Sequence, residues 1–346
     1  MEKKNIAWIN TCKALCMLLV YLNHCCNILG ADLKQWDNFY FALYVNSFFI
    51  ISGYLLFRKQ LGEKALLETR PQFLNGGGKL LFGNIVWKIM VPTMIFALIN
   101  FFPKKLLRGE PIIVKELLFD TLGGCSLWFT CALALAELYF LIMLMTRYRP
   151  IWFYAACATC LFLLGTVLQH SGLVVDAFPK QFPWWYKNSL FASIYIAIGG
   201  VYWKYEKEIA NVFSNKYILA MGFIVYLILL YGLQGKLAYM VAICDVNLGG
   251  LLVSSFGCII LIEICKRLPS WAYLQNMGKN TLLYYFFCGA SPVVVCSILK
   301  KVFVFSPYVQ LPVAMLLSLS ITGLLVFVIT RFMPYLLDFR LIKSSK

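Results

Sequence analysis

Ten long apolar runs, separated by short connections that hold most of the charged residues, constrain this chain more than any other feature. An α-helix rises 1.5 Å per residue, so about 20 apolar residues cross the hydrocarbon core of a bilayer. The composition agrees, because 61% of the residues are hydrophobic and only 13% are charged, whereas about a quarter of the residues in a soluble domain are charged. The runs that we predict to span the membrane are 6–29, 39–57, 81–102, 126–145, 151–168, 189–203, 217–234, 246–265, 281–299 and 309–332.

The connections between these runs are too short to hold a soluble domain, the longest being 58–80, 103–125 and 169–188. We therefore predict an all-α, polytopic membrane protein of about ten transmembrane helices, with residues 1–346 forming a single domain. The sixth run is short, and the stretch 236–245 is a half-span that we interpret as a re-entrant segment. Three consecutive glycines at 76–78 predict a flexible hinge before the third run.

The basic residues indicate how the chain is oriented. The formal net charge is +16, but the Lys and Arg residues lie in short connections rather than on a basic domain, which argues against a nucleic-acid partner. More of them fall on the side of the membrane that holds the N-terminus, so both termini are predicted to be cytoplasmic and the protein to lie in the cell membrane. The connection 103–125 fits this orientation least well, because it carries basic residues on the predicted outer side.

The thirteen cysteines mostly lie inside apolar runs, where a thiol packs as a small hydrophobic group. The four-ligand Cys and His spacings typical of zinc sites are missing from the sequence, and we expect no metal site.

Two titratable residues share one face of the first run. Lys13 and His24 are eleven positions apart, and at about 100° per residue this places them on the same face, about 16 Å apart along the helix. Ionisable groups inside a span are costly and indicate function. Alternatively, Lys13 reaches the inner headgroups and His24 is an interfacial histidine that contacts a backbone carbonyl.

Two glutamates also lie within apolar runs. Glu137 is in the middle of its run and must be protonated or paired if it is buried. Glu263 lies near the end of the eighth run, where we expect it to pair with Lys266 or Arg267.

Four short segments along the chain can be compared with known sequence motifs. They are Lys13-x10-His24, the segment FFIISGY at 48–54, Leu127-Trp128-Phe129, and GKNTL at 278–282 followed by Tyr285. In this order, and on about ten helices, they resemble the motifs of the acyltransferase 3 family of integral membrane O-acyltransferases. This chain has Lys at the first position where Arg is commoner. Ser126 and Cys288 stand where many members of the family carry His, and these departures bear on the acceptor more than on the chemistry.

The resemblance implies transfer of an acyl group, most simply acetyl, from acyl-CoA to a hydroxyl of a cell-envelope carbohydrate or lipid-linked glycan. The donor is then a substrate, and no permanently bound cofactor is expected. His24 suits the role of base, because imidazole titrates near neutral pH. The second histidine, His170, is predicted to lie in a surface loop. No Ser/His/Asp set is evident, so direct transfer is the simpler route, with Cys25 as a candidate for a covalent one.

Further residues are assigned by position and by resemblance. Lys13, which we also count as catalytic, would contact the phosphates of CoA with Lys88 and Arg58, near Ser52 and Gly53. The acceptor would contact Trp128, Ser126, Glu137 and Tyr285. Several of these residues also have an alternative explanation that involves no ligand. Arg58 would follow the positive-inside rule, Ser52 and Gly53 would pack helices, and Trp128 would anchor the helix at the membrane interface.

The alternative function is a secondary transporter or flippase, because intramembrane Lys, His and Glu residues suit that class as well. A transporter would predict an inverted repeat with broken helices at matching positions, and the sequence shows no such repeat.

Overall fold

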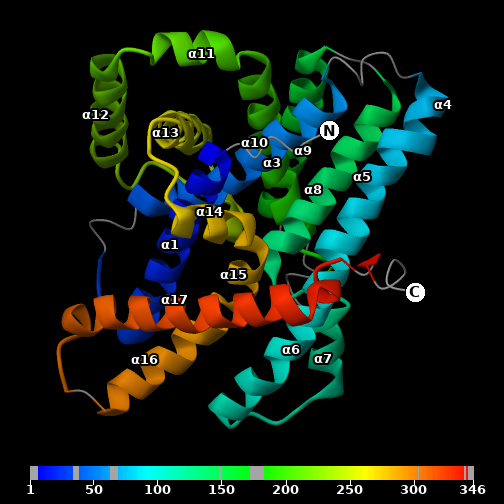
Figure 1. Cartoon of the computed structure of the whole chain (residues 1–346). Coiled ribbons are helices and arrows are strands. Elements are labelled where there is room, and N and C mark those ends of the chain that lie inside the picture. Colours follow the sequence, from blue (N-terminus) through cyan, green and yellow to red (C-terminus); the bar gives the residue numbers. More distant parts are fainter. Residues whose placement is uncertain are drawn as a thin grey trace. The chain divides into compact units, whose positions relative to one another are not determined.

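The computed structural model describes residues 7–33, 39–62, 69–147, 150–171, 183–302, 304–338 and 340–341. These residues are almost entirely helical (Figure 1). The α-helices are α1 (Ala7–Leu29), α3 (Tyr44–Gln60), α4 (Arg70–Phe73), α5 (Lys79–Asn84), α6 (Val91–Arg108), α7 (Val114–Thr121), α8 (Trp128–Met145), α9 (Ile151–His170), α10 (Tyr186–Lys204), α11 (Glu206–Val212), α12 (Lys216–Gly232), α13 (Leu248–Cys265), α14 (Ala272–Lys279), α15 (Thr281–Phe287), α16 (Ala290–Val302) and α17 (Pro307–Phe332). The remaining elements are η2 (Leu74–Gly78), η3 (Ile85–Met90), η4 (Val241–Ile243), η5 (Pro334–Leu336), β1 (Tyr239–Met240) and β2 (Asp245–Val246).

Each of the ten predicted spans coincides with helix, and the all-α membrane architecture is confirmed. Within the described residues, seven helices are long and apolar enough to cross a membrane, or up to nine if each bent pair counts as one span. The sixth predicted span corresponds to α10, which does not meet that test. The polar residues Lys187, Asn188, Ser189 and Ser193 lower its hydropathy, and all but Lys187 are buried against protein.

The half-span predicted at 236–245 forms neither a helix nor a re-entrant helix. Its residues form the two-stranded antiparallel pair β1 and β2, in which Tyr239 faces Val246 and Met240 faces Asp245. The short 3₁₀ turn η4 joins the strands, and Asn188 of α10 donates its side-chain amide to the Val241 carbonyl at 2.5 Å. This side-chain donor satisfies a backbone acceptor that regular helix would otherwise satisfy.

The hinge predicted at the three glycines is wrong, because these residues lie inside a helix that runs continuously from Arg70 to Leu106. The segments η2 and η3 have π-helical geometry within it. A Cβ added at Gly76 would meet no atom within 4 Å, so this position does not need glycine for packing. Local π-turns in longer helices are frequently found at functional sites, and η3 carries Lys88.

The chain divides into two compact units. The first comprises residues 1–48, 213–237 and 249–333, and the second comprises residues 49–212, 238–248 and 334–346. In the first unit, α1 packs against α14, α16 and α17 (Figure 1). In the second, α10 packs against α8 and α9, and α6 against α7. The single domain over 1–346 stays a prediction.

In the second unit, glycines allow α3 and α10 to approach closely. A Cβ added at Gly53 would lie 2.0 Å from the Ile196 carbonyl oxygen, and one at Gly199 would lie 2.0 Å from that of Ile50. Small residues at a helix crossing let two backbones touch, as is common in membrane proteins. This contact fixes α3, which carries Ser52 and Arg58.

Candidate functional site

The first helix carries both titratable residues of the first motif. Lys13 and His24 lie on α1 and are half-buried. Their shared face follows from helical geometry, with about 16 Å between them along the axis. Lys13 forms no ion pair with any residue in the described ranges. An unpaired cation in an apolar setting is costly. We therefore expect the Lys13 ammonium group to contact either an anionic ligand or the lipid headgroups.

The ring of His24 faces a thiol from the last motif segment. Cys288 Sγ lies 3.7 Å from His24 Nε2, which is within hydrogen-bond reach of a sulfur atom. Cys288 is buried, with only 5% of its surface exposed, and it stands in the break between α15 and α16, which are bent by 46°. Two segments that sequence reasoning treated as separate motifs therefore meet at His24.

A buried polar network holds α1 in place one turn before His24. The Tyr21 hydroxyl donates to the Tyr284 carbonyl at 3.0 Å, and its oxygen lies 2.9 Å from Thr322 Oγ1, within hydrogen-bond distance. Ser291 Oγ lies 2.8 Å from the same Thr322 oxygen. The network thereby joins α1 to α15, α16 and α17. Because buried polar groups are costly to leave unpaired, it fixes the register of α1 against these helices.

The GKN segment packs against the beginning of α1. A Cβ added at Gly278 would lie 2.0 Å from the Asn10 carbonyl oxygen, so only glycine fits there. The side chain of Gln275 accepts from Asn10 Nδ2 at 3.0 Å and donates to the Ala7 carbonyl at 2.9 Å. Tyr285, which follows this segment, is half-buried, and its ring is tilted by 56° against that of Phe286, with 6.1 Å between ring centroids.

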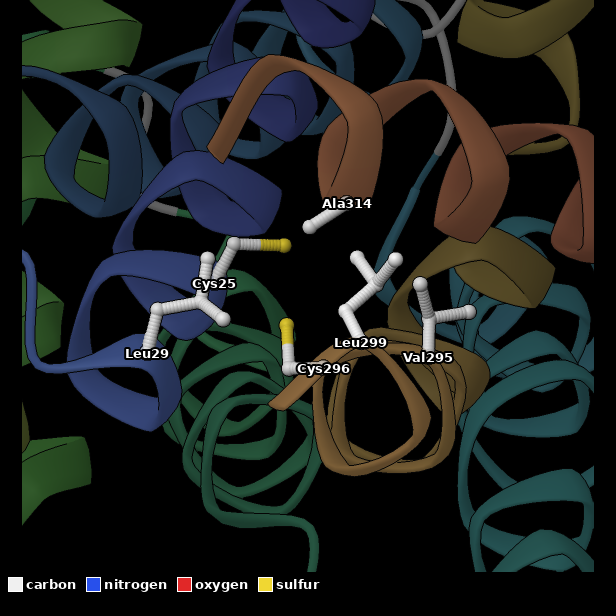
Figure 2. Close-up of a cluster of buried hydrophobic side chains, with 6 residues drawn as sticks. All are labelled: Cys25, Leu29, Val295, Cys296, Leu299 and Ala314. Atoms are coloured by element: carbon white, nitrogen blue, oxygen red, sulfur yellow. The ribbon is translucent and has the colours of Figure 1, made fainter. Parts of the chain in front are cut away.

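Cys25, the thiol considered from sequence for a covalent route, lies in an apolar cluster (Figure 2). The cluster joins α1 to α16 and α17. Its buried members are Cys25, Leu29, Val295, Cys296, Leu299 and Ala314. Packing therefore explains this thiol.

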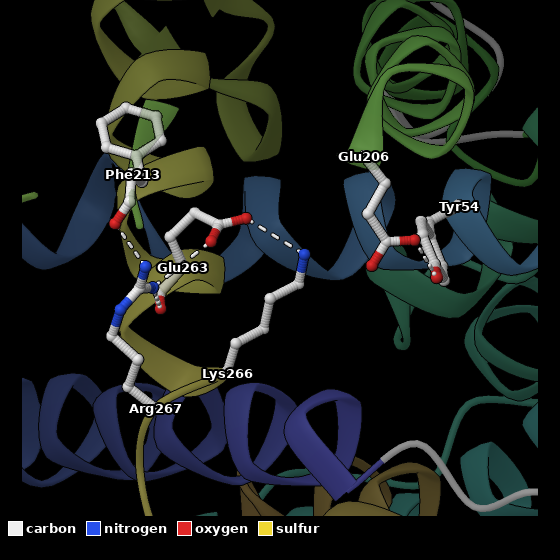
Figure 3. A network of polar contacts seen from close by, with 6 residues as sticks. All are labelled: Tyr54, Glu206, Phe213, Glu263, Lys266 and Arg267. Atoms are coloured by element: carbon white, nitrogen blue, oxygen red, sulfur yellow. Dashed lines mark hydrogen bonds and ion pairs between the residues drawn. The ribbon is translucent and has the colours of Figure 1, made fainter. Parts of the chain in front are cut away.

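In the second unit, helix packing accounts for Gly53, whose Cα faces the backbone of α10. Its neighbour Ser52 is half-buried, and Arg58 is exposed in the last turn of α3. Tyr54 on the same helix donates its hydroxyl to Glu206 Oε2 at 2.7 Å (Figure 3). These contacts orient α3.

Lys88 is also exposed, but it is close to a carboxylate. Its Nζ lies 3.7 Å from Asp338 Oδ2. Asp338 is held more tightly by Arg340, whose Nη2 lies 2.8 Å from the same oxygen and 3.1 Å from Asn84 Oδ1. The Arg340 guanidinium keeps the pKa of Asp338 below its ordinary value. The C-terminal segment is thereby attached to the helix that carries Lys88.

Trp128 begins α8 and belongs to an aromatic group that sequence reasoning missed. Its ring centroid lies 6.2 Å from that of Trp185. Trp185 Nε1 donates to the Cys125 carbonyl at 3.1 Å, and Trp184 Nε1 donates to the Leu122 carbonyl at 2.9 Å. Exposed Ser126 lies in the same loop and donates to the Asp120 carbonyl at 3.3 Å.

Both tryptophans have positive φ values, 52° for Trp184 and 56° for Trp185. This conformation is uncommon for a bulky residue and marks a site held by its surroundings. The only sequence signal was the adjacent Trp pair itself.

The two intramembrane glutamates have different surroundings. Glu137 is half-buried on α8. Glu263 is buried and pairs with Lys266 at 3.1 Å and with Arg267 at 3.3 Å (Figure 3), which confirms its predicted pairing. Arg267 also donates to the Phe213 carbonyl. Glu263 is thus a structural ion pair, whereas Glu137 stays a site candidate.

Comparison with known proteins gives one finding. A protein-family model described as an acyltransferase domain, Acyl_transf_3, matches residues 6–332, and this range includes all four motif segments. No curated protein and no solved structure matches the chain.

Proposed function

Because the chain belongs to the acyltransferase 3 family, a family of membrane acyltransferases, we propose that it transfers an acetyl group from acetyl-CoA to a carbohydrate hydroxyl. The acceptor is a cell-envelope polysaccharide or glycolipid, and the enzyme works in the cell membrane. The observation that carries this proposal is the position of His24. It is half-buried on α1, on the same face as Lys13, and next to the last motif segment.

The chemistry needs one proton acceptor, because the thioester of acyl-CoA is already activated. Neutral His24 takes the proton of the acceptor hydroxyl as its oxygen attacks the acyl carbonyl. The proton then passes to the leaving sulfur. A base of this kind typically contributes 10²–10⁴-fold to a rate.

The CoA phosphates need cations. Lys13 has no anionic partner among the described residues, and Arg58 is exposed at the end of α3. Lys88 is exposed, and its contact with Asp338 is 3.7 Å long. Ser52 and Gly53 on α3 are further proposed contacts of the donor.

The acceptor would be bound by an aromatic ring and by hydroxyl and carboxyl groups. Trp128 offers a ring face of the kind that stacks on a sugar, with Ser126 exposed one loop position before the LWF segment. Glu137 on α8 and Tyr285 in the first unit are further proposed acceptor contacts.

The first experiment measures transfer of label from acetyl-CoA to envelope glycans in membranes that contain the wild type, His24→Ala or His170→Ala. His170 is the matched control, because it is exposed at the end of α9, rather than in the predicted loop, and its ring lies 2.8 Å from the Thr166 carbonyl oxygen of the same helix. We expect His24→Ala to lower transfer by about 100-fold or more and His170→Ala to leave it unchanged. Equal transfer by the wild type and His24→Ala would contradict the role of His24.

A further inference from the structure

The thiol of Cys288 is placed like a nucleophile rather than like a packing residue. Its sulfur is 3.7 Å from His24 Nε2. Cys258 and Cys131, by contrast, are buried thiols whose sulfurs lie beside backbone carbonyl oxygens. A carbonyl cannot take the proton of a thiol, whereas a neutral imidazole can. A nucleophile in contact with a base is the arrangement that covalent catalysis requires.

The residue that follows Cys288 is not packed against the rest of the chain. The next residue, Gly289, is exposed, and a Cβ added there would meet no atom within 4 Å. The helix α16 begins at Ala290, and the first N–H groups of a helix have no acceptor within the helix. Such groups favour negative charge that develops beside them. The bend between α15 and α16 therefore holds the thiol, which contacts its base, next to an exposed glycine in sequence.

We propose that Cys288 carries the acyl group as a covalent thioester between donor and acceptor. This inference rests on the proposed function, since acyl-CoA supplies the acyl group. His24 takes the Cys288 thiol proton, the sulfur attacks the acyl carbonyl, and the bond from the carbonyl to the CoA sulfur breaks. CoA leaves as the thiol with the proton from His24.

The second half-reaction reverses the direction of the proton. His24 takes the proton of the acceptor hydroxyl, and the oxygen attacks the Cys288 thioester. The bond from the carbonyl to Cys288 breaks, and His24 returns the proton to the sulfur. One thioester replaces another in the first half-reaction, so that step is nearly balanced in energy. A free thiolate would be costly in this buried position. Because His24 contacts the thiol, it can take the proton while the sulfur attacks, and no free thiolate has to form beforehand.

The test traps the covalent intermediate. Purified protein is incubated without acceptor with acetyl-CoA, propionyl-CoA or succinyl-CoA, and peptides are examined by mass spectrometry. We expect an acyl adduct on Cys288, removed by hydroxylamine, in the wild type and in Cys258→Ala but not in His24→Ala. Cys258 is the matched control because it is buried in the same unit.

Transfer to acceptor is measured in parallel. We expect Cys288→Ala to lower it by about 100-fold or more and Cys258→Ala to change it less than about twofold, with ping-pong kinetics in the wild type. Full transfer by Cys288→Ala, with no adduct in the wild type, would overturn the inference and leave the proposed function standing. Absence of both transfer and adduct with every donor would overturn both. An adduct on Cys288 without any transfer would support the inference and place the error in the acceptor.

Discussion

At the scale of single residues, the proposed site centres on His24, whose ring nitrogen Nε2 lies 3.7 Å from the Cys288 sulfur. The spacing of Lys13 and His24 was enough to place them on one face, because helix geometry is local. The partner of His24 was not predictable, since Cys288 is 264 positions away and no local rule connects the two. The contacts of Trp184 and Trp185 were not predictable for the same reason, because the carbonyl groups that accept from their indole N–H groups are about 60 positions earlier in the sequence.

Gly278 gives a prediction at this scale. Gly278→Ala would place a methyl group 2.0 Å from the Asn10 carbonyl oxygen, and overpacking of this kind typically costs 1–3 kcal/mol. We expect a lower midpoint of thermal unfolding in detergent. Gly232→Ala is the control, because a Cβ there would meet nothing within 4 Å and its midpoint should not fall. If both variants unfold at the same temperature as the wild type, α1 and α14 do not pack as described.

At the scale of elements, apolar length predicted the helices well, because a span must be long and apolar wherever it packs. It failed where side chains rather than length decide the structure. The segment 236–245 became a strand pair because Asn188 satisfies its backbone, and the predicted hinge became helix because a π-turn accommodates the glycines. The polar face of α10 is tolerated because protein, rather than lipid, surrounds it.

The first turn of α8 carries a prediction about the acceptor. Trp128→Ala should raise the KM for the glycan acceptor and leave the KM for acyl-CoA unchanged, because the ring is proposed to stack on sugar. Trp152→Ala is the control, since that ring is exposed on α9. Steady-state kinetics with each substrate varied in turn would measure both constants. If only the KM for acyl-CoA changes, Trp128 contacts the donor rather than the acceptor.

At the scale of the whole chain, orientation in the membrane is the feature that sequence predicts and that labelling can test. With both termini cytoplasmic, tags at either end should be reached by antibody only after the membrane is permeabilised. A tag inserted after Gly109 should be reached in intact cells, since that exposed turn lies in the connection predicted to face outward. This connection is the sharpest test, because its basic residues oppose the assignment. Protection of the Gly109 tag in intact cells would reverse that assignment.

The contacts of α1 also set an order in time. Asn10 bonds to Gln275 across 265 positions of sequence, and Tyr21 bonds to Thr322 across 301. The ribosome releases α1 first and these partners near the end of synthesis, so the polar groups of the first helix must wait in the bilayer for most of translation. The last quarter of the chain therefore completes the first helix, and a ribosome that stalls before residue 275 leaves His24 inserted but without its site.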